Sequence, residues 1–143
     1  MKVKDIMTTN VITVTPETKL KEVAKIIKGH RINGLPVLNE AREVVGIITI
    51  TDLLRLLRDI HYWERVEKEN PEVRIIKDIL VKEKNESTVN MKMTKMIWTV
   101  DEDSELDDVL ELMYKYDIHT IPVTKDHKLV GIIGATDIVN SCI

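Results

Sequence analysis

Two aspartates each end a heptad that occurs twice in the chain. The heptad reads GIITITD at residues 46–52 and GIIGATD at residues 131–137. In each copy an apolar run leads into small polar residues and a carboxylate, where a helical pattern begins. A carboxylate can accept hydrogen bonds from two adjacent hydroxyls of a sugar, and the free amides of a helix start favour an anion. The residue types therefore fit a ligand that carries a sugar diol and an anionic group.

Both heptads belong to a longer duplication. Gly46 and Gly131 stand 85 positions apart, whereas Pro36 and Pro122 stand 86 apart. The shift of 86 also aligns ITVTPETKLKEVAKII with WTVDEDSELDDVLELM, and RINGLPV with DIHTIPV. The copies differ at polar positions and agree in apolar register, which indicates a duplicated structural unit.

Each copy predicts the element order β-α-β-β-α. Short β-rich runs flank an amphipathic helix, whose apolar positions in the first copy are Leu20, Val23, Ile26 and Ile27. We expect Thr15 to cap this helix and Gly29 to mark its end. The predicted fold class is α/β (α+β), with the two units packed about a pseudo-twofold axis. Because one such unit buries too little surface alone, we expect the two to pack together with a cleft between them.

Residues 59–89 belong to neither copy. We therefore divide the chain into a first repeat at 1–58, a helical insert at 59–89 and a second repeat at 90–143. Within the insert, Pro71 is expected to separate an extension of the helix that begins near Asp52 from a second amphipathic helix.

Composition limits the classes of function. Hydrophobic residues make up 43% of the chain and charged residues 31%, as in folded proteins. The formal net charge of −3 and the scattered Lys and Arg predict no surface for nucleic acid. No apolar run is long enough to cross a bilayer, the first ten residues lack a signal-peptide core, and Cys142 is the single cysteine. We expect a cytoplasmic protein with neither a nucleic acid nor a membrane as partner.

The sequence resembles a tandem pair of CBS domains, the cystathionine-β-synthase regulatory repeat, also called a Bateman module. The likeness is carried by INGLPVLN…VVGIITITD and IHTIPVTKDHKLVGIIGATD, and it covers about residues 1–58 and 90–143. Such pairs commonly bind adenosine-containing ligands between their repeats. The resemblance implies a stand-alone regulatory module, not an enzyme, that binds AMP, ADP or ATP on behalf of a separate partner protein. It implies no cofactor, and S-adenosylmethionine or NAD is an alternative ligand.

The resemblance also implies two clefts, because the ribose-binding aspartate of one repeat faces the purine-lining strands of the other. The residues expected in the first cleft are Asp137, Thr136, Thr15, Leu20, Ile32 and Gly34, with His119 near a phosphate. Those expected in the second are Asp52, Thr49, Ile118 and Thr120, with Leu106 nearby.

The first cleft is expected to be the better site. In the second copy, Asp101 stands where the first has a threonine and would repel a phosphate, and Thr120 stands where Gly34 leaves room for a purine. The opposite departure is Gly134, which lacks the hydroxyl that Thr49 offers.

The same residues also have structural alternatives, which the sequence leaves open. Asp52 and Asp137 are suited to capping a helix, Thr49 to ending a strand, and His119 to a structural hydrogen bond. Four of the six methionines are expected to pack in the core rather than line a ligand surface: Met7, Met91, Met93 and Met96. A module whose clefts are degenerate and empty would be a structural dimerisation scaffold. An enzyme would need a clustered nucleophile and base, and the histidines and Cys142 have no such spacing.

The helices that follow the two aspartates carry apolar residues on more than one face. These residues are Leu53, Leu54, Leu56, Leu57, Ile138 and Val139. Because large exposed apolar patches mark interfaces, we expect a homodimer.

Overall fold

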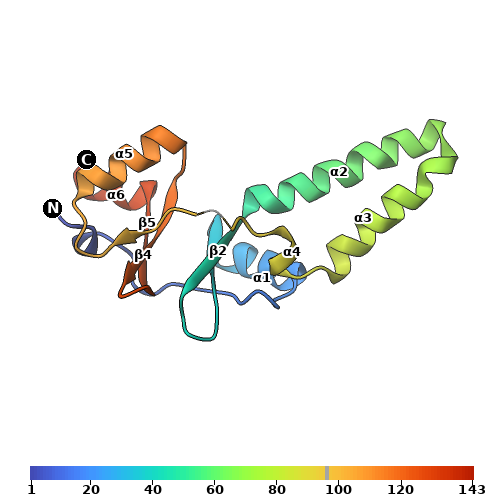
Figure 1. The fold of residues 1–143 in the computed structure, drawn as a ribbon. Helices are drawn as coiled ribbons and strands as arrows, with labels where there is room; N and C mark the ends of the chain where they lie inside the picture. Colours follow the sequence, from blue (N-terminus) through green and yellow to red (C-terminus); the bar gives the residue numbers. More distant parts are fainter. Residues whose placement is uncertain (96) are drawn as a thin grey trace.

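Both repeats fold into a small sheet with two helices, which confirms the predicted class (Figure 1). The structure is a computed structural model and describes residues 1–95 and 97–143. The first repeat contains α1 (Leu20–His30), β1 (Gly34–Leu38), β2 (Val44–Thr49) and the start of α2 (Ile50–Glu69). The second contains β3 (Val100–Asp101), α5 (Leu106–Tyr116), β4 (Thr120–Lys125), β5 (Lys128–Gly134) and α6 (Ala135–Cys142).

The strands of the two sheets pair in the same order and the same directions. β1 is antiparallel to β2, β4 is antiparallel to β5, and β3 runs parallel to β4 through the pair Val100 and Val123. The matching residues of the first repeat, Val14 and Val37, form a single parallel bridge. The first repeat therefore has the same strand order, with its outer strand reduced to one bridge.

Each sheet is extended by the segment that precedes the other repeat. Thr8 exchanges two backbone hydrogen bonds with Ile132 of β5, with N···O distances of 2.8 and 2.9 Å. Thr94 exchanges two with Ile47 of β2, at 2.8 and 3.0 Å. The chain thus crosses between the repeats twice, and the two crossings are related by the duplication.

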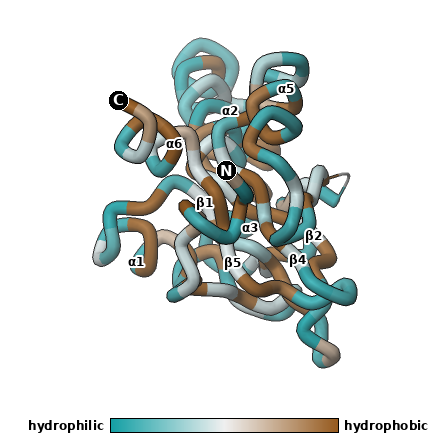
Figure 2. The backbone as a smooth tube through the Cα atoms, turned by 90° about the vertical axis from the view of Figure 1, so that its left-hand side faces the viewer, coloured by the Kyte–Doolittle hydropathy of each residue, from teal (hydrophilic) through white to brown (hydrophobic). Residues whose placement is uncertain are grey.

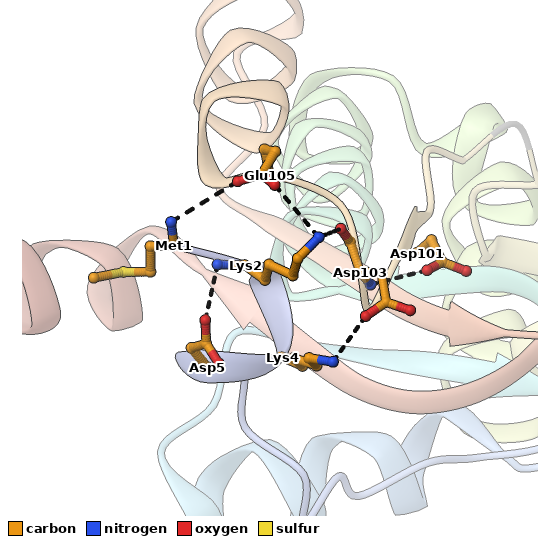
Figure 3. A network of polar contacts seen from close by, with 7 residues as sticks. All are labelled: Met1, Lys2, Lys4, Asp5, Asp101, Asp103 and Glu105. Atoms are coloured by element: carbon orange, nitrogen blue, oxygen red, sulfur yellow. Dashed lines mark hydrogen bonds and ion pairs between the residues drawn. The ribbon is translucent and has the colours of Figure 1, made fainter.

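The amino-terminal crossing is held in place by packing and by ion pairs (Figure 3). A 3-10 turn (Val3–Asp5) places Val3 in the core of the second repeat with no exposed surface. Lys4 Nζ lies 2.9 Å from Asp103 Oδ1, and Lys2 Nζ lies 3.4 Å from Glu105 Oε1. Because the backbone N–H of Val3 also donates to Ser104, these residues act as part of the second repeat.

The hydrophobic core is divided between the repeats. One buried cluster lies in the first repeat and includes Leu35, Ile48 and Val23. The other lies in the second repeat and includes Ile121 and Ile133. In Figure 2 the helices alternate between hydrophilic and hydrophobic positions along the chain. This is the expected pattern for helices that bury one face against a sheet.

The insert forms a helical hairpin that projects from the first repeat (Figure 1). α2 runs on to Glu69, a 3-10 turn (Pro71–Val73) follows, and α3 (Arg74–Glu86) returns to the module before α4 (Val89–Lys92). Pro71 therefore separates two helices as predicted. Ile60 is buried in the first core, and Leu80 and Val81 pack against it. The expected boundary between residues 58 and 59 consequently falls inside α2, and the base of the hairpin belongs to the first repeat. Among the described helices, none is long and apolar enough to cross a membrane.

Two predicted ends of α1 are wrong. The helix begins after Lys19, not after Thr15, because residues 16–18 form a turn and Lys19 is extended and pairs with Thr88. Gly29 lies inside the helix, and Arg31 ends it in the left-handed conformation with φ 53°.

Candidate functional site

The two heptad aspartates occupy the third position of their helices. β2 passes directly into α2 and β5 directly into α6, so the helices begin at Ile50 and Ala135, two residues earlier than predicted. The backbone N–H of Thr49 donates to Asp52 Oδ2 at 2.8 Å, and that of Gly134 donates to Asp137 Oδ2 at 2.8 Å. Each carboxylate thus satisfies one free amide of a helix start, as in a capping box.

The second oxygen of each carboxylate has a different neighbour in each repeat. Asp52 Oδ1 lies 3.6 Å from Arg55 Nη1, and Asp137 Oδ1 accepts a hydrogen bond of 3.3 Å from the Thr8 hydroxyl. An ionised carboxylate has about four lone-pair positions. Both aspartates therefore keep capacity to accept hydrogen bonds from a ligand while they cap.

Asp137 lines a cavity of about 230 Å³ between the repeats. The second repeat contributes Thr120, Ile132, Gly134 and Asp137, and the first contributes Thr8, Asn10, Val11, Ile12, Ile32, Asn33 and Gly34. Apolar side chains from both repeats form much of its wall, with hydroxyl and amide groups beside the carboxylate. Such a wall suits a flat aromatic ring with a polar substituent.

Asp52 lines a second cavity of about 420 Å³. The first repeat contributes Asn33, Gly34, Thr49, Ile50, Thr51, Asp52 and Arg55, and the second contributes Thr94, Asp117, Ile118, His119 and Thr120. Asn33, Gly34 and Thr120 line both cavities, so the two clefts are neighbours. The larger volume lies at Asp52.

Two glycines leave room for the segments that cross between the repeats, which are residues 7–8 and 93–94, to approach these clefts. A Cβ atom on Gly46 would lie 2.7 Å from Met93 Sδ and 2.9 Å from the carbonyl oxygen of Thr94. A Cβ atom on Gly131 would lie 2.6 Å from Met7 Sδ, beside Thr8. Met7 and Met93 pack against the two cores, as predicted, whereas Met91 is exposed and Met96 lies outside the described residues. The close approach brings Thr8 and Thr94 into the clefts.

The structure brings some of the expected residues together and separates others. Asp137, Ile32 and Gly34 line the first cleft, and Asp52, Thr49, Ile118 and Thr120 line the second. His119 lies in the second cleft rather than the first. Leu106 packs against the core of the second repeat.

Three residues expected in the first cleft lie elsewhere. Leu20 is buried in the core, and the Thr15 hydroxyl lies 3.2 Å from that of Thr18. Thr136 is exposed on α6 and is not among the described residues that line the cleft. The position of Thr15 follows from the start of α1, which lies after Lys19 rather than after Thr15.

Sequence reasoning missed the segment from Thr8 to Ile12 as a cleft wall. The pairing of Met7 and Thr8 with Met93 and Thr94 in the duplication was a signal, but it did not show that each segment crosses to the other repeat. Arg55 was also missed, although it stands three residues after Asp52, on the same side of a helix.

Comparison with known proteins identifies the duplicated unit. The family model of the CBS domain matches residues 3–59 and 87–143. The chain belongs to the CBS-domain family. As a CBS pair it is 31% identical to the CBS-domain pair of protein MJ0100, solved with 5′-methylthioadenosine and S-adenosyl-L-methionine, with a TM-score of 0.76 over 99% of this chain and 94% of that chain.

Two relatives in sequence cover nearly the whole CBS pair. It is 32% identical over 95% of its length to L-aspartate semialdehyde sulfurtransferase of Methanocaldococcus jannaschii, but it spans only 22% of that protein. It is 30% identical over 96% of its length to the uncharacterized protein YlbB of Bacillus subtilis, of which it spans 79%.

Within the described residues, no group of three or more His, Cys, Asp or Glu could hold a metal ion.

Proposed function

We propose that this CBS pair is a regulatory module that binds an adenosine-containing ligand in the clefts between its repeats and reports its presence to a separate protein. The observation that carries the proposal is the pair of carboxylates, Asp52 and Asp137, each placed at a helix start in an inter-repeat cavity. Each can accept hydrogen bonds from a ribose without leaving its cap. The similar MJ0100 pair, solved with two adenosyl ligands, supports this choice of ligand.

A ligand in either cleft would join the two repeats. In the first cleft, Asp137 comes from the second repeat and Ile32 and Gly34 come from the first. A ribose on Asp137 would therefore place its purine against the other repeat. Because such a ligand binds only the arrangement that brings both walls together, it stabilises that arrangement by its differential affinity. This provides a signal that a partner can read without any chemical reaction.

We also propose that the module is a homodimer. Leu54 and Leu57 of α2 and Val139 of α6 are exposed, and the open depression between α5 and α6 has an apolar side formed by residues such as Leu110 and Ile138. A second copy with the same apolar helices would cover both surfaces. A twofold dimer of this kind is self-complementary.

Thermal unfolding with a ligand panel tests the proposed function. The panel is AMP, ATP, 5′-methylthioadenosine, S-adenosylmethionine and NAD, with guanosine monophosphate as the matched control. A ligand at 100 times its dissociation constant stabilises a one-site protein by about 2.7 kcal/mol. We expect at least one adenosyl ligand to raise the unfolding temperature and to be recovered unchanged. No rise with any of them would favour the scaffold, and consumption of a ligand would indicate an enzyme.

A further inference from the structure

The two clefts differ in the cations that line them. Arg55 and His119 line the Asp52 cleft. The described residues that line the Asp137 cleft include no Lys, Arg or His. A phosphate in the Asp137 cleft would meet one carboxylate and no lining cation, whereas one in the Asp52 cleft would meet two carboxylates, a guanidinium and an imidazole.

The difference follows the duplication at two separate positions. His119 corresponds to Asn33 by the shift of 86, and Arg55 corresponds to Asn140 by the shift of 85. At both positions one repeat has a side chain that can carry positive charge and the other has an amide. Asn33 lines both clefts, and Asn140 is exposed on α6. An amide offers hydrogen bonds to a ligand but no charge.

Arg55 and His119 approach the Asp52 cleft from opposite repeats. Arg55 lies on α2, one turn after Thr51, with 63% of its side chain exposed. Its Nη1 lies 3.6 Å from Asp52 Oδ1, which is an ion pair without a close hydrogen bond. Arg55 can therefore turn towards a phosphate and bind it through two parallel N–H groups.

His119 has a comparable freedom. It precedes β4, its side chain is 74% exposed, and its Nε2 lies 3.7 Å from Asp117 Oδ1. The charged or titratable groups that line the cleft are thus two carboxylates, Asp52 and Asp117, one guanidinium and one imidazole. With Asp52 engaged by a ribose, the guanidinium and the imidazole are the two groups that can attract an anion, and Asp117 is the one carboxylate that opposes them.

We propose that the two clefts are specialised by charge. The Asp52 cleft takes a phosphorylated adenosyl ligand, which Arg55 and His119 recognise through its phosphate. The Asp137 cleft takes an adenosyl ligand without a phosphate. The inference rests on the proposed function and adds the ligand class of each cleft.

AMP and adenosine form the matched ligand pair for the test, because they differ only in the phosphate. Each is titrated by calorimetry into Asp137→Asn, which retains the Asp52 cleft, and into Asp52→Asn, which retains the Asp137 cleft. We expect Asp137→Asn to bind AMP at least about tenfold more tightly than adenosine, since one charge-assisted contact is worth roughly a decade. We expect Asp52→Asn to bind adenosine at least as tightly as AMP.

Replacing Arg55 and His119 by asparagine, the residue found at the matching position of the other repeat, tests whether these two side chains cause the preference for AMP. In the Asp137→Asn protein, Arg55→Asn and His119→Asn should each reduce the preference for AMP several-fold and leave adenosine affinity unchanged. Arg58→Asn removes the same charge from the same helix outside the cleft lining, and it should change neither affinity. Circular dichroism verifies that each variant is folded.

The outcomes separate the two proposals. Equal AMP preference in both clefts, or a preference that survives Arg55→Asn and His119→Asn together, overturns the charge specialisation and leaves adenosyl binding intact. No binding of AMP, adenosine or 5′-methylthioadenosine to the unsubstituted protein overturns the proposed function and the specialisation with it.

Discussion

At the scale of single residues, Asp52 and Asp137 combine a structural and a proposed binding role. Asp52 is 7% exposed and takes two hydrogen bonds from Thr49, whereas Asp137 takes one from Gly134 and one from Thr8. The capping contact uses Oδ2 in both cases. An asparagine side chain has one carbonyl oxygen, which can keep the capping contact, but its amide then faces the cleft.

Asp137→Asn should therefore separate capping from ligand binding. We expect apo stability in urea to change by no more than about 0.5 kcal/mol, because the capping acceptor is kept. We expect affinity for 5′-methylthioadenosine in calorimetry to fall by about 10- to 100-fold, because a hydrogen bond to a charged group is lost. Asp52→Asn is the matched variant and should leave this affinity less affected. Unchanged affinity in both variants would leave the aspartates as caps alone.

At the scale of elements, the two crossing segments depend on Gly46 and Gly131. Both glycines lie in central positions of their strands, where the carbonyl oxygens of Thr94 and Thr8 approach closely. These contacts join residues far apart in sequence, so they make the segment before each repeat part of the opposite sheet. Removing the space for them should loosen the walls of both clefts.

Gly46→Ala and Gly131→Ala should each destabilise the protein by about 1–3 kcal/mol, as overpacking does. Gly29→Ala is the matched control, because Gly29 lies inside α1 and nothing lies within 4 Å of an added Cβ. That change should stabilise by about 0.5–1 kcal/mol through helix propensity. Urea denaturation measures all three. Equal effects at the three glycines would show that the crossing contacts do not limit the space.

The α2–α3 hairpin is tied together near its tip by one carboxylate. Glu67 on α2 accepts a hydrogen bond of 2.8 Å from Arg74 Nε on α3, and Lys77 Nζ lies 3.0 Å from its other oxygen. The hydrogen bond from Arg74 is the largest cause that holds the pKa of Glu67 below its ordinary value, and the hydrogen bond from Lys77 is the second largest. A carboxylate with a lowered folded-state pKa stabilises the fold above its unfolded-state pKa, and this contribution is lost as pH falls through the folded-state value.

Carboxyl NMR of Glu67 should accordingly show a titration midpoint that rises in Arg74→Gln, where the largest cause of the shift is removed. Arg58→Gln, which removes a charge from the same hairpin away from Glu67, should leave the midpoint unchanged. A midpoint that is the same in Arg74→Gln and in the unsubstituted protein would contradict the contact.

At the scale of the whole molecule, the duplication predicted the architecture better than the site. Apolar register predicted both sheets and their helices, because these follow from local periodicity, and Pro71 predicted the break in the insert, because proline disrupts a helix interior. It misplaced the start of α1, where Lys19 pairs with a residue far along the chain. It also placed His119 in the first cleft, whereas His119 lines the second. Thr8 was missed because periodicity does not show which sheet a segment joins. Such errors concern long-range pairing, which the sequence of one repeat does not contain.

The proposed homodimer belongs to the same scale. Light scattering at tens of micromolar should give twice the chain mass of 16.5 kDa. Leu57→Glu should shift the protein towards a monomer, because it places a charge on the proposed apolar interface. Ile75→Glu is the control, since Ile75 is also apolar and exposed but lies on α3. A monomer mass for the unsubstituted protein would contradict the proposed homodimer.

The most direct measurement of the central claim is a crystal structure of the protein grown with 5′-methylthioadenosine and AMP. We predict an adenosyl group between the repeats, with ribose hydroxyls within about 2.6–3.0 Å of the carboxylate of Asp137 or Asp52. Ligand bound on another surface, or clefts that remain empty at saturating ligand, would contradict the claim that these carboxylates form a ribose site.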